Sequence, residues 1–297
     1  MTMRPMSLFE SGESTGAVSL SDLFQGSKKI IDSNNKTIQD IAFYVCRGGW
    51  PSSLNLDSDN AVKLAYEYVD GIINSEISRV DNVKRDKTRA EKLLKSYARN
   101  ISTSVKLTEI QKDVLANDLE TFDIETLNLY INALKLLFVI EDQPAWSPNL
   151  RSKTAIRTTD TRHFVDPSIA VAALGLNPSG LLSDLKLFGY LFESLCIRDL
   201  RVYAERIDGK VYHYRDKSGL EADAVIQLRD GSYALIEVKL GDQERIDAGA
   251  KNLLKLRDLI DTDKMKEPIF LMVLTGTNFA YQREDGVYVV PITSLKD

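Results

Sequence analysis

Two acids and a lysine with the spacing of a metal site lie between positions 221 and 239. Asp223 belongs to one short strand pattern, and Glu237 and Lys239 belong to the next. If Asp223 lies opposite Glu237, the two carboxylates come within about 5 Å and repel each other unless a cation or a shared proton compensates. A divalent ion bound by both is the simplest compensation, and carboxylate ligands favour Mg²⁺ or Mn²⁺.

The turn between these strands decides whether the acids meet. A three-residue loop at Arg229-Asp230-Gly231, a type I turn closed by a left-handed glycine, places Asp223 opposite Glu237 and Glu221 opposite Lys239. The other face then carries only apolar residues, which suit a core. A two-residue loop would instead put the two acids on opposite faces. An exposed polar face, whose acids simply pair with the lysine and another base, is a further alternative.

A third acid lies in a long apolar pattern that predicts a helix from about 181 to 204. Glu193 is surrounded there by aromatic and aliphatic residues, and a carboxylate in such surroundings is costly unless it is paired or bound to metal. Pairing with Arg198 is the alternative. Strand patterns follow at 211–215, 221–229 and 233–240, then a helix at 245–260 and strands at 269–274 and 287–291. This order predicts an α/β/α layered domain with a mixed sheet.

The composition narrows the class of protein. The 297 residues are 43% hydrophobic and 27% charged, which is typical of folded domains. With two cysteines, two histidines and no Cys-x-x-Cys, a zinc site is disfavoured. The net charge of −5 argues against a chain that coats nucleic acid over its whole surface. No long apolar run and no signal peptide occurs, so we expect a cytoplasmic protein without a membrane partner.

The N-terminal half reads as mainly helical. After a peripheral arm at residues 1–36, helical patterns appear at 58–82 and 87–100, and two capped helices follow, from Thr108 and after Asp123. Short strand candidates at 138–140 and 155–156 complete the order of a winged helix, a DNA-binding fold. The predicted wing is basic, with Arg151, Lys153, Arg157, Arg162 and His163 as candidate nucleic-acid contacts. A mainly architectural or protein-contact role for this module is the alternative.

The C-terminal order resembles the PD-(D/E)xK nuclease superfamily. By that resemblance Glu193 matches the acid of the first helix, Asp223 the acid of the second strand, and Glu237 and Lys239 the Glu-x-Lys of the third. The three acids would be metal ligands, and the lysine would position water or stabilise developing charge. The family's usual Pro-Asp pair is absent, and Leu220-Glu221-Ala222-Asp223 stands in its place.

Further sequence segments are similar to the C-terminal region of a large prokaryotic family of AAA-type ATPases. They include Arg4-Pro5-Met6-Ser7-Leu8-Phe9-Glu10-Ser11, Arg47-Gly48-Gly49-Trp50-Pro51 and Arg162-His163-Phe164-Val165-Asp166-Pro167-Ser168. The resemblance implies a remnant of an ATPase domain at 1–36, a helical region with a winged helix at 37–165, and a nuclease-like domain at 166–297. The sequence contains no phosphate-cradling loop, so no ATPase activity is expected from this chain alone.

Three functional hypotheses remain from the sequence. The first is a Mg²⁺- or Mn²⁺-dependent nuclease acting on DNA, coupled to a winged helix. The second is a non-catalytic module that binds nucleic acid or a protein and uses the acids structurally. The third is a regulatory remnant of an ATPase that is inert without its motor domain. An ATPase domain or another protein is the expected partner besides DNA.

Overall fold

The computed structural model describes residues 3–27, 30–116, 122–151 and 155–297. The chain divides into two compact units, each built from separated segments. We call the first the sheet unit (residues 1–41, 143–158 and 195–297) and the second the helical unit (residues 42–142 and 159–194). The sequence predicted boundaries at 36/37 and 165/166, whereas residues 143–158 belong with the sheet.

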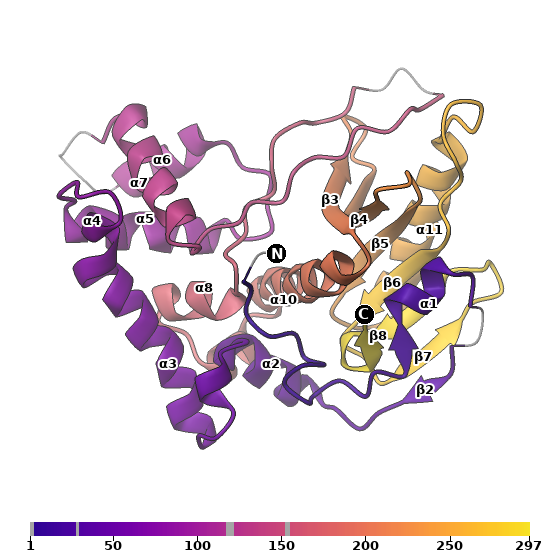
Figure 1. The fold of residues 1–297 in the computed structure, drawn as a ribbon, viewed down its shortest axis with the longest axis horizontal. Coiled ribbons are helices and arrows are strands. Elements are labelled where there is room, and N and C mark those ends of the chain that lie inside the picture. Colours follow the sequence, from indigo (N-terminus) through magenta and orange to yellow (C-terminus); the bar gives the residue numbers. More distant parts are fainter. Residues whose placement is uncertain (1–2, 28–29, 117–121, 152–154) are drawn as a thin grey trace. The chain divides into compact units, whose positions relative to one another are not determined.

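The sheet unit is built on seven strands in the order β2-β7-β8-β6-β5-β4-β3 (Figure 1). Strands β5, β6 and β8 are mutually parallel and the other neighbours are antiparallel, so the expected mixed sheet is confirmed. A separate parallel pair joins β1 to β9. The strands are β1 (Val18–Ser19), β2 (Asp32–Ser33), β3 (Gly209–Arg215), β4 (Glu221–Leu228), β5 (Tyr233–Lys239), β6 (Leu271–Thr275), β7 (Phe279–Gln282), β8 (Tyr288–Pro291) and β9 (Leu295–Lys296).

Both faces of the central strands are buried. Helix α11 (Gln243–Leu259) buries Leu253 and Leu256 in a cluster with Val225 and Leu235 of β4 and β5. The alternate strand residues, such as Ile236, point to the opposite face and are also buried. Figure 1 shows α11 on one side of the sheet and the C-terminal part of α10 (Leu185–Arg206) on the other. The strands therefore have apolar residues at successive positions, as strands covered on both faces do.

The N-terminal arm is an integral part of the sheet unit, which corrects the expectation of a peripheral segment. Leu8 is buried, and its backbone N–H donates to Asp199 Oδ2 of α10 at 2.9 Å. Helix α1 (Leu20–Phe24) buries Leu20 and Leu23. Strand β2 then extends the sheet beside β7. Two-residue strands carry too little alternation to be recognised in a sequence, which explains why the segment was read as an arm.

The helical unit is organised around α8, which packs against α3 and α5. Asp166 caps α8 and also accepts the Gly49 N–H at 2.9 Å, while Trp50 Nε1 donates to Ser168 Oγ at 2.9 Å. A Cβ on Gly48 would lie 2.4 Å from that hydroxyl, so the Gly-Gly-Trp turn needs its glycine there. The helical segments are α2 (Ile38–Arg47), η1 (Pro51–Ser53), α3 (Ser58–Gly71), η2 (Ile72–Glu76), α4 (Ile77–Arg79), α5 (Lys87–Arg99), α6 (Leu107–Leu115), α7 (Ile124–Leu136), α8 (Pro167–Leu174) and α9 (Pro178–Ser183).

The two helices of the expected winged helix form as α6 and α7, but the described residues do not form the wing. Ile140 pairs with Phe164 in the helical unit, whereas Ile156 pairs with Asp216 in the sheet unit. The connector that contains Trp146 lies along β3 and donates the Trp146 N–H to His213 O at 2.7 Å. An edge strand has unpaired backbone groups. The segment that was predicted to form a hairpin therefore hydrogen-bonds to the edge strand β3.

None of the helices in the described ranges combines the length and apolar character that spanning a membrane requires.

Candidate functional site

The β4–β5 hairpin has the three-residue loop that places the acids in phase. Leu228 N–H donates to Ser232 O at 2.8 Å, and Gly231 is left-handed with φ of 83°. The paired positions run from Gln227 opposite Tyr233 to Ala224 opposite Ile236. Because Asp223 and Glu237 come next in this register, the alternative of a two-residue loop is excluded.

The regular ladder nevertheless ends one pair before the acids. The Val238 N–H donates to Asp223 Oδ2 at 2.7 Å, so a side-chain carboxylate replaces the backbone carbonyl that would accept this bond in a regular ladder. Opposite this point, the pairing with β3 shifts register between Tyr212 and Tyr214. The buried Gln143 side chain donates from Nε2 to both Tyr212 O and Asp223 O, each at 2.9 Å. Irregular pairing of this kind is common beside active sites because it re-aims a side chain.

Lys239 joins the two carboxylates. Its Nζ lies 3.3 Å from Asp223 Oδ2 and hydrogen-bonds to Glu237 Oε2. Exposure falls inward across the group: the side chain of Lys239 is 23% exposed, that of Asp223 12%, and that of Glu237 0%. The predicted convergence of these three residues is therefore present. The regular β4–β5 pairs stop before Glu221 and Lys239, which were predicted to lie opposite each other, and on its other side Glu221 pairs with Arg215 of β3.

Ionising the buried carboxyl group of Glu237 is unfavourable, and the positive charge of Lys239 offsets only part of that cost. Burial raises the pKa of Glu237 well above its usual value of 4.5, and the nearby Asp223 charge adds to the increase, whereas Lys239 opposes it. Its second oxygen, Oε1, is buried and has no hydrogen-bond partner among the described residues. A buried carboxylate oxygen without a partner is costly, and a bound cation would compensate it. The residues therefore fit an oxygen-liganded divalent ion.

Two residues that shape this site, Gly249 and Gln143, were not predicted from the sequence. Helix α11 passes directly over it, and a Cβ on Gly249 would lie 3.4 Å from both Glu237 Cβ and Lys239 Cε. A glycine in the middle of a helical pattern is a signal for such close approach. Gln143 has no comparable signal, because its role depends on an irregularity in strands about 70 and 80 residues away.

Glu193 lies on α10, in the segment that belongs to the helical unit, and is half-buried. Its place as a third metal ligand stays a prediction. Its proposed alternative partner, Arg198, hydrogen-bonds the neighbouring Asp199 from Nε at 2.8 Å, and both are buried. Within the described ranges, no group of three or more His, Cys, Asp or Glu side chains has metal-binding geometry.

Of the five basic residues expected on the wing, the four that the structure describes are not all exposed. Arg151 and Arg157 are exposed in the sheet unit. Arg162 is buried in the helical unit, where it donates to Val105 O at 3.0 Å and to Asp142 Oδ2 at 2.9 Å. His163 is also buried, 3.2 Å from Ser194 Oγ. Burial removes these two from a surface that contacts DNA. Lys153 lies outside the described residues.

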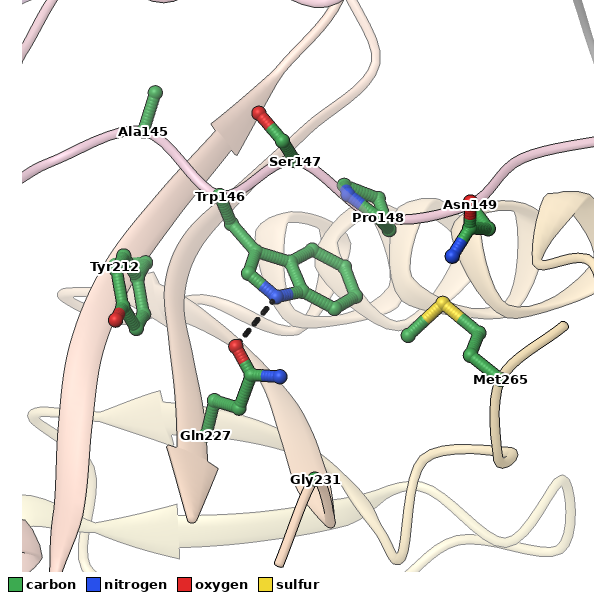
Figure 2. Close-up of a pocket in the computed structure, with 9 residues that line it drawn as sticks. All are labelled: Ala145, Trp146, Ser147, Pro148, Asn149, Tyr212, Gln227, Gly231 and Met265. Atoms are coloured by element: carbon green, nitrogen blue, oxygen red, sulfur yellow. Dashed lines mark hydrogen bonds between the residues drawn. The ribbon is translucent and has the colours of Figure 1, made fainter. Parts of the chain in front are cut away.

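A separate cavity of about 280 Å³ lies at the turn end of the same hairpin. Figure 2 shows Trp146 at its centre, with Nε1 donating to Gln227 Oε1 at 3.2 Å. The lining residues are Ala145, Trp146, Ser147, Pro148, Asn149, Tyr212, Gln227, Gly231 and Met265. None of these side chains is charged, so this cavity lacks the ligands of a Mg²⁺ or Mn²⁺ site.

Comparison with known proteins gives two domain matches. Residues 38–180 match a domain of unknown function, DUF8612, and residues 188–295 match another, DUF4143. No curated protein matches the chain. Among solved structures, a chain from the tetradecameric assembly of Thermococcus gammatolerans McrB AAA+ hexamers with bound McrC is similar at 9% identity and a TM-score of 0.29. The match covers 86% of this chain and 70% of that one, but the score is too low to support an argument. DUF4143 occurs in proteins associated with AAA-type ATPases, which links the C-terminal region to such systems.

Proposed function

We propose that the sheet unit is a metal-dependent nuclease module that hydrolyses phosphodiester bonds, with DNA as the expected substrate, and that it works beside an AAA-type ATPase. The observation that supports this most is the buried Glu237 Oε1 without a hydrogen-bond partner among the described residues, on a carboxylate that Lys239 also joins to Asp223. The link of DUF4143 to AAA-type ATPase systems supports the proposed partner.

Each residue has a distinct proposed task. Asp223 and Glu237 would hold Mg²⁺ or Mn²⁺, which would polarise the scissile phosphate and lower the pKa of bound water. Glu193 is the predicted third ligand. The Lys239 ammonium is partly exposed and within hydrogen-bond distance of both acids, and it would orient an attacking water or stabilise developing negative charge.

A non-catalytic module is the second candidate, and one observation favours it. Lys239 already neutralises part of the charge on the two acids, as an ion pair with a structural role would. In this alternative the acids and the lysine fix the end of the hairpin, and the unit binds nucleic acid or a protein without cutting it.

Cleavage of single- and double-stranded DNA in Mg²⁺ or Mn²⁺ tests the proposal. Asp223→Asn keeps an oxygen for the Val238 N–H but removes the charge, so cleavage should fall to background. Lys239→Ala should lower the rate by about 10²–10³-fold. Asp230→Asn changes an exposed acid at the turn end of the same hairpin and should leave the rate unchanged. A wild type that cuts neither substrate, or site variants that cut as fast as wild type, would contradict the nuclease.

A further inference from the structure

We propose that Arg157 and Arg215 form a phosphate-binding site for the DNA backbone beside the acid cluster of Asp223, Glu237 and Lys239. The site deepens the proposed function and rests on it for the identity of the ligand, a phosphodiester strand. No sequence motif joins these two residues, because Arg157 lies in the connector after Trp146 and Arg215 lies at the end of β3.

The connector brings the two arginines together. Arg157 N–H donates to Arg215 O at 2.8 Å, and Lys217 N–H donates to Ala155 O at 3.1 Å. Ile156 and Asp216 form an antiparallel bridge between these two bonds. The connector therefore pairs like an additional strand along the end of β3, and Arg157 lies directly beside Arg215.

Arg215 links this pair of arginines to the acids. It lies opposite Glu221 on β4, and its Nε is 3.5 Å from Glu221 Oε2. Glu221 is two residues before Asp223 and so shares its strand face. The arginines and the acid cluster therefore lie close together at the open end of the hairpin, the end away from the turn.

Both guanidinium groups have capacity for an anion. Arg157 is exposed, and the side chain of Arg215 is 40% exposed. The buried Nε of Arg215 lies 3.5 Å from Glu221 Oε2 without hydrogen-bond geometry, so the exposed part of this side chain is what a phosphate can reach. A phosphate group offers the several acceptor oxygens that a planar guanidinium binds in pairs.

The charges of the acids, the arginines and the lysine favour a bound anion only when the acids also hold a divalent ion. Glu221, Asp223 and Glu237 can carry three negative charges when ionised, and Arg157, Arg215 and Lys239 carry three positive charges. When all three acids are ionised the six charges cancel, and the group then attracts a phosphodiester only weakly. A divalent ion held by the acids would add two positive charges and leave the arginines free to bind backbone phosphates. DNA binding should therefore depend jointly on a divalent ion and on the arginines.

The test measures binding rather than cleavage. Fluorescence anisotropy with labelled single- and double-stranded oligonucleotides in Ca²⁺, over a series of salt concentrations, gives both affinity and its salt dependence. Arg157→Ala and Arg215→Ala should each weaken binding and lower the salt slope by about 0.9 on duplex or 0.7 on single strands. Arg157→Lys keeps the charge and loses the planar fork, so it should recover the slope but only part of the affinity.

Arg229→Ala is the matched control. This arginine lies at the turn end of the same hairpin, with a side chain 83% exposed and ion-paired to Asp208 at 3.1 Å. The inference is overturned if Arg229→Ala weakens binding as much as the two site variants, if the site variants leave both affinity and slope unchanged, or if wild type binds neither oligonucleotide. If Arg215→Ala does not fold, the exposed Arg157 variants still decide the question. Binding that needs the arginines but is never followed by cleavage supports this site and overturns the nuclease alone.

Discussion

The two ends of the β4–β5 hairpin differ in how completely their polar groups are hydrogen-bonded. At the turn end, Leu228 N–H, Asp230 and the Trp146 indole N–H all have partners, and the strands pair regularly. At the open end the ladder stops, a carboxylate replaces a backbone acceptor, and a fully buried glutamate keeps an oxygen without a hydrogen-bond partner among the described residues.

This difference indicates which end of the hairpin contributes mainly to stability and which to function. The turn end follows the local rules of strand pairing and aromatic packing, so it should contribute mainly to folding. The open end breaks those rules among buried residues, and departures of this kind are expected where function requires them. Variants at the two ends should therefore separate stability from metal-dependent properties.

The largest effect on stability is expected at the turn end. Trp146 is buried and packs against Tyr233 with ring centroids 4.9 Å apart and against Tyr214 at 6.4 Å. Trp146→Ala should lower the free energy of unfolding by about 3–5 kcal/mol, which urea denaturation measures. Divalent ion binding by the folded fraction should remain. Loss of ion binding in folded protein would show that the two ends are not separable.

The open end should instead govern how stability depends on pH. The raised pKa of Glu237 means that the folded protein keeps a proton that the unfolded chain releases above pH 4.5. Wild-type stability should therefore fall as pH rises from 4.5 towards the raised pKa of Glu237, and Glu237→Gln should remove this contribution. Urea denaturation over the range from about pH 5 to pH 8 measures it. Glu244→Gln, at an exposed glutamate of α11, is the control, and equal slopes in both variants would refute the assignment.

A smaller effect is expected from the backbone of the turn. Gly231 has φ of 83°, and a Cβ there would meet no atom within 4 Å, so a substitution tests conformation alone. Gly231→Ala should cost about 1–2 kcal/mol, and Gly231→Asn should cost less because asparagine tolerates the left-handed region. Thermal or urea denaturation gives both values. Cleavage rates should be unchanged, and a lower rate in folded Gly231→Ala would couple the turn to the site.

The hairpin was predictable because its signals are local. Alternating apolar residues and the Asp-Gly turn set the strands, the loop and the shared face of Asp223 and Glu237. The start of α8 is set locally too, because Asp166 caps the helix and Pro167 occupies its first position. Helices and strands with clear periodicity therefore appeared close to their predicted places.

The remaining features depend on tertiary pairing. Strand candidates at 138–140 and 155–156 look like a hairpin, but Ile140 and Ile156 find partners in different units. The burial of Arg162 follows from Asp142 and Val105, which no local pattern connects to it. The end of the ladder at Asp223 coincides with the Gln143 hydrogen bond and the register shift in β3, so the sequence predicted the convergence of the acids but not the irregular strand pairing around them.

Titration of the protein with Mn²⁺, followed by electron paramagnetic resonance of the free ion, tests the central claim most directly. We predict that wild type takes up Mn²⁺ at one site, that Asp223→Asn and Glu237→Gln each weaken binding by at least about tenfold, and that Asp230→Asn at the turn end binds like wild type. A wild type that takes up no Mn²⁺, or site variants that bind it as tightly as Asp230→Asn does, would contradict the assignment of the open end as a metal centre.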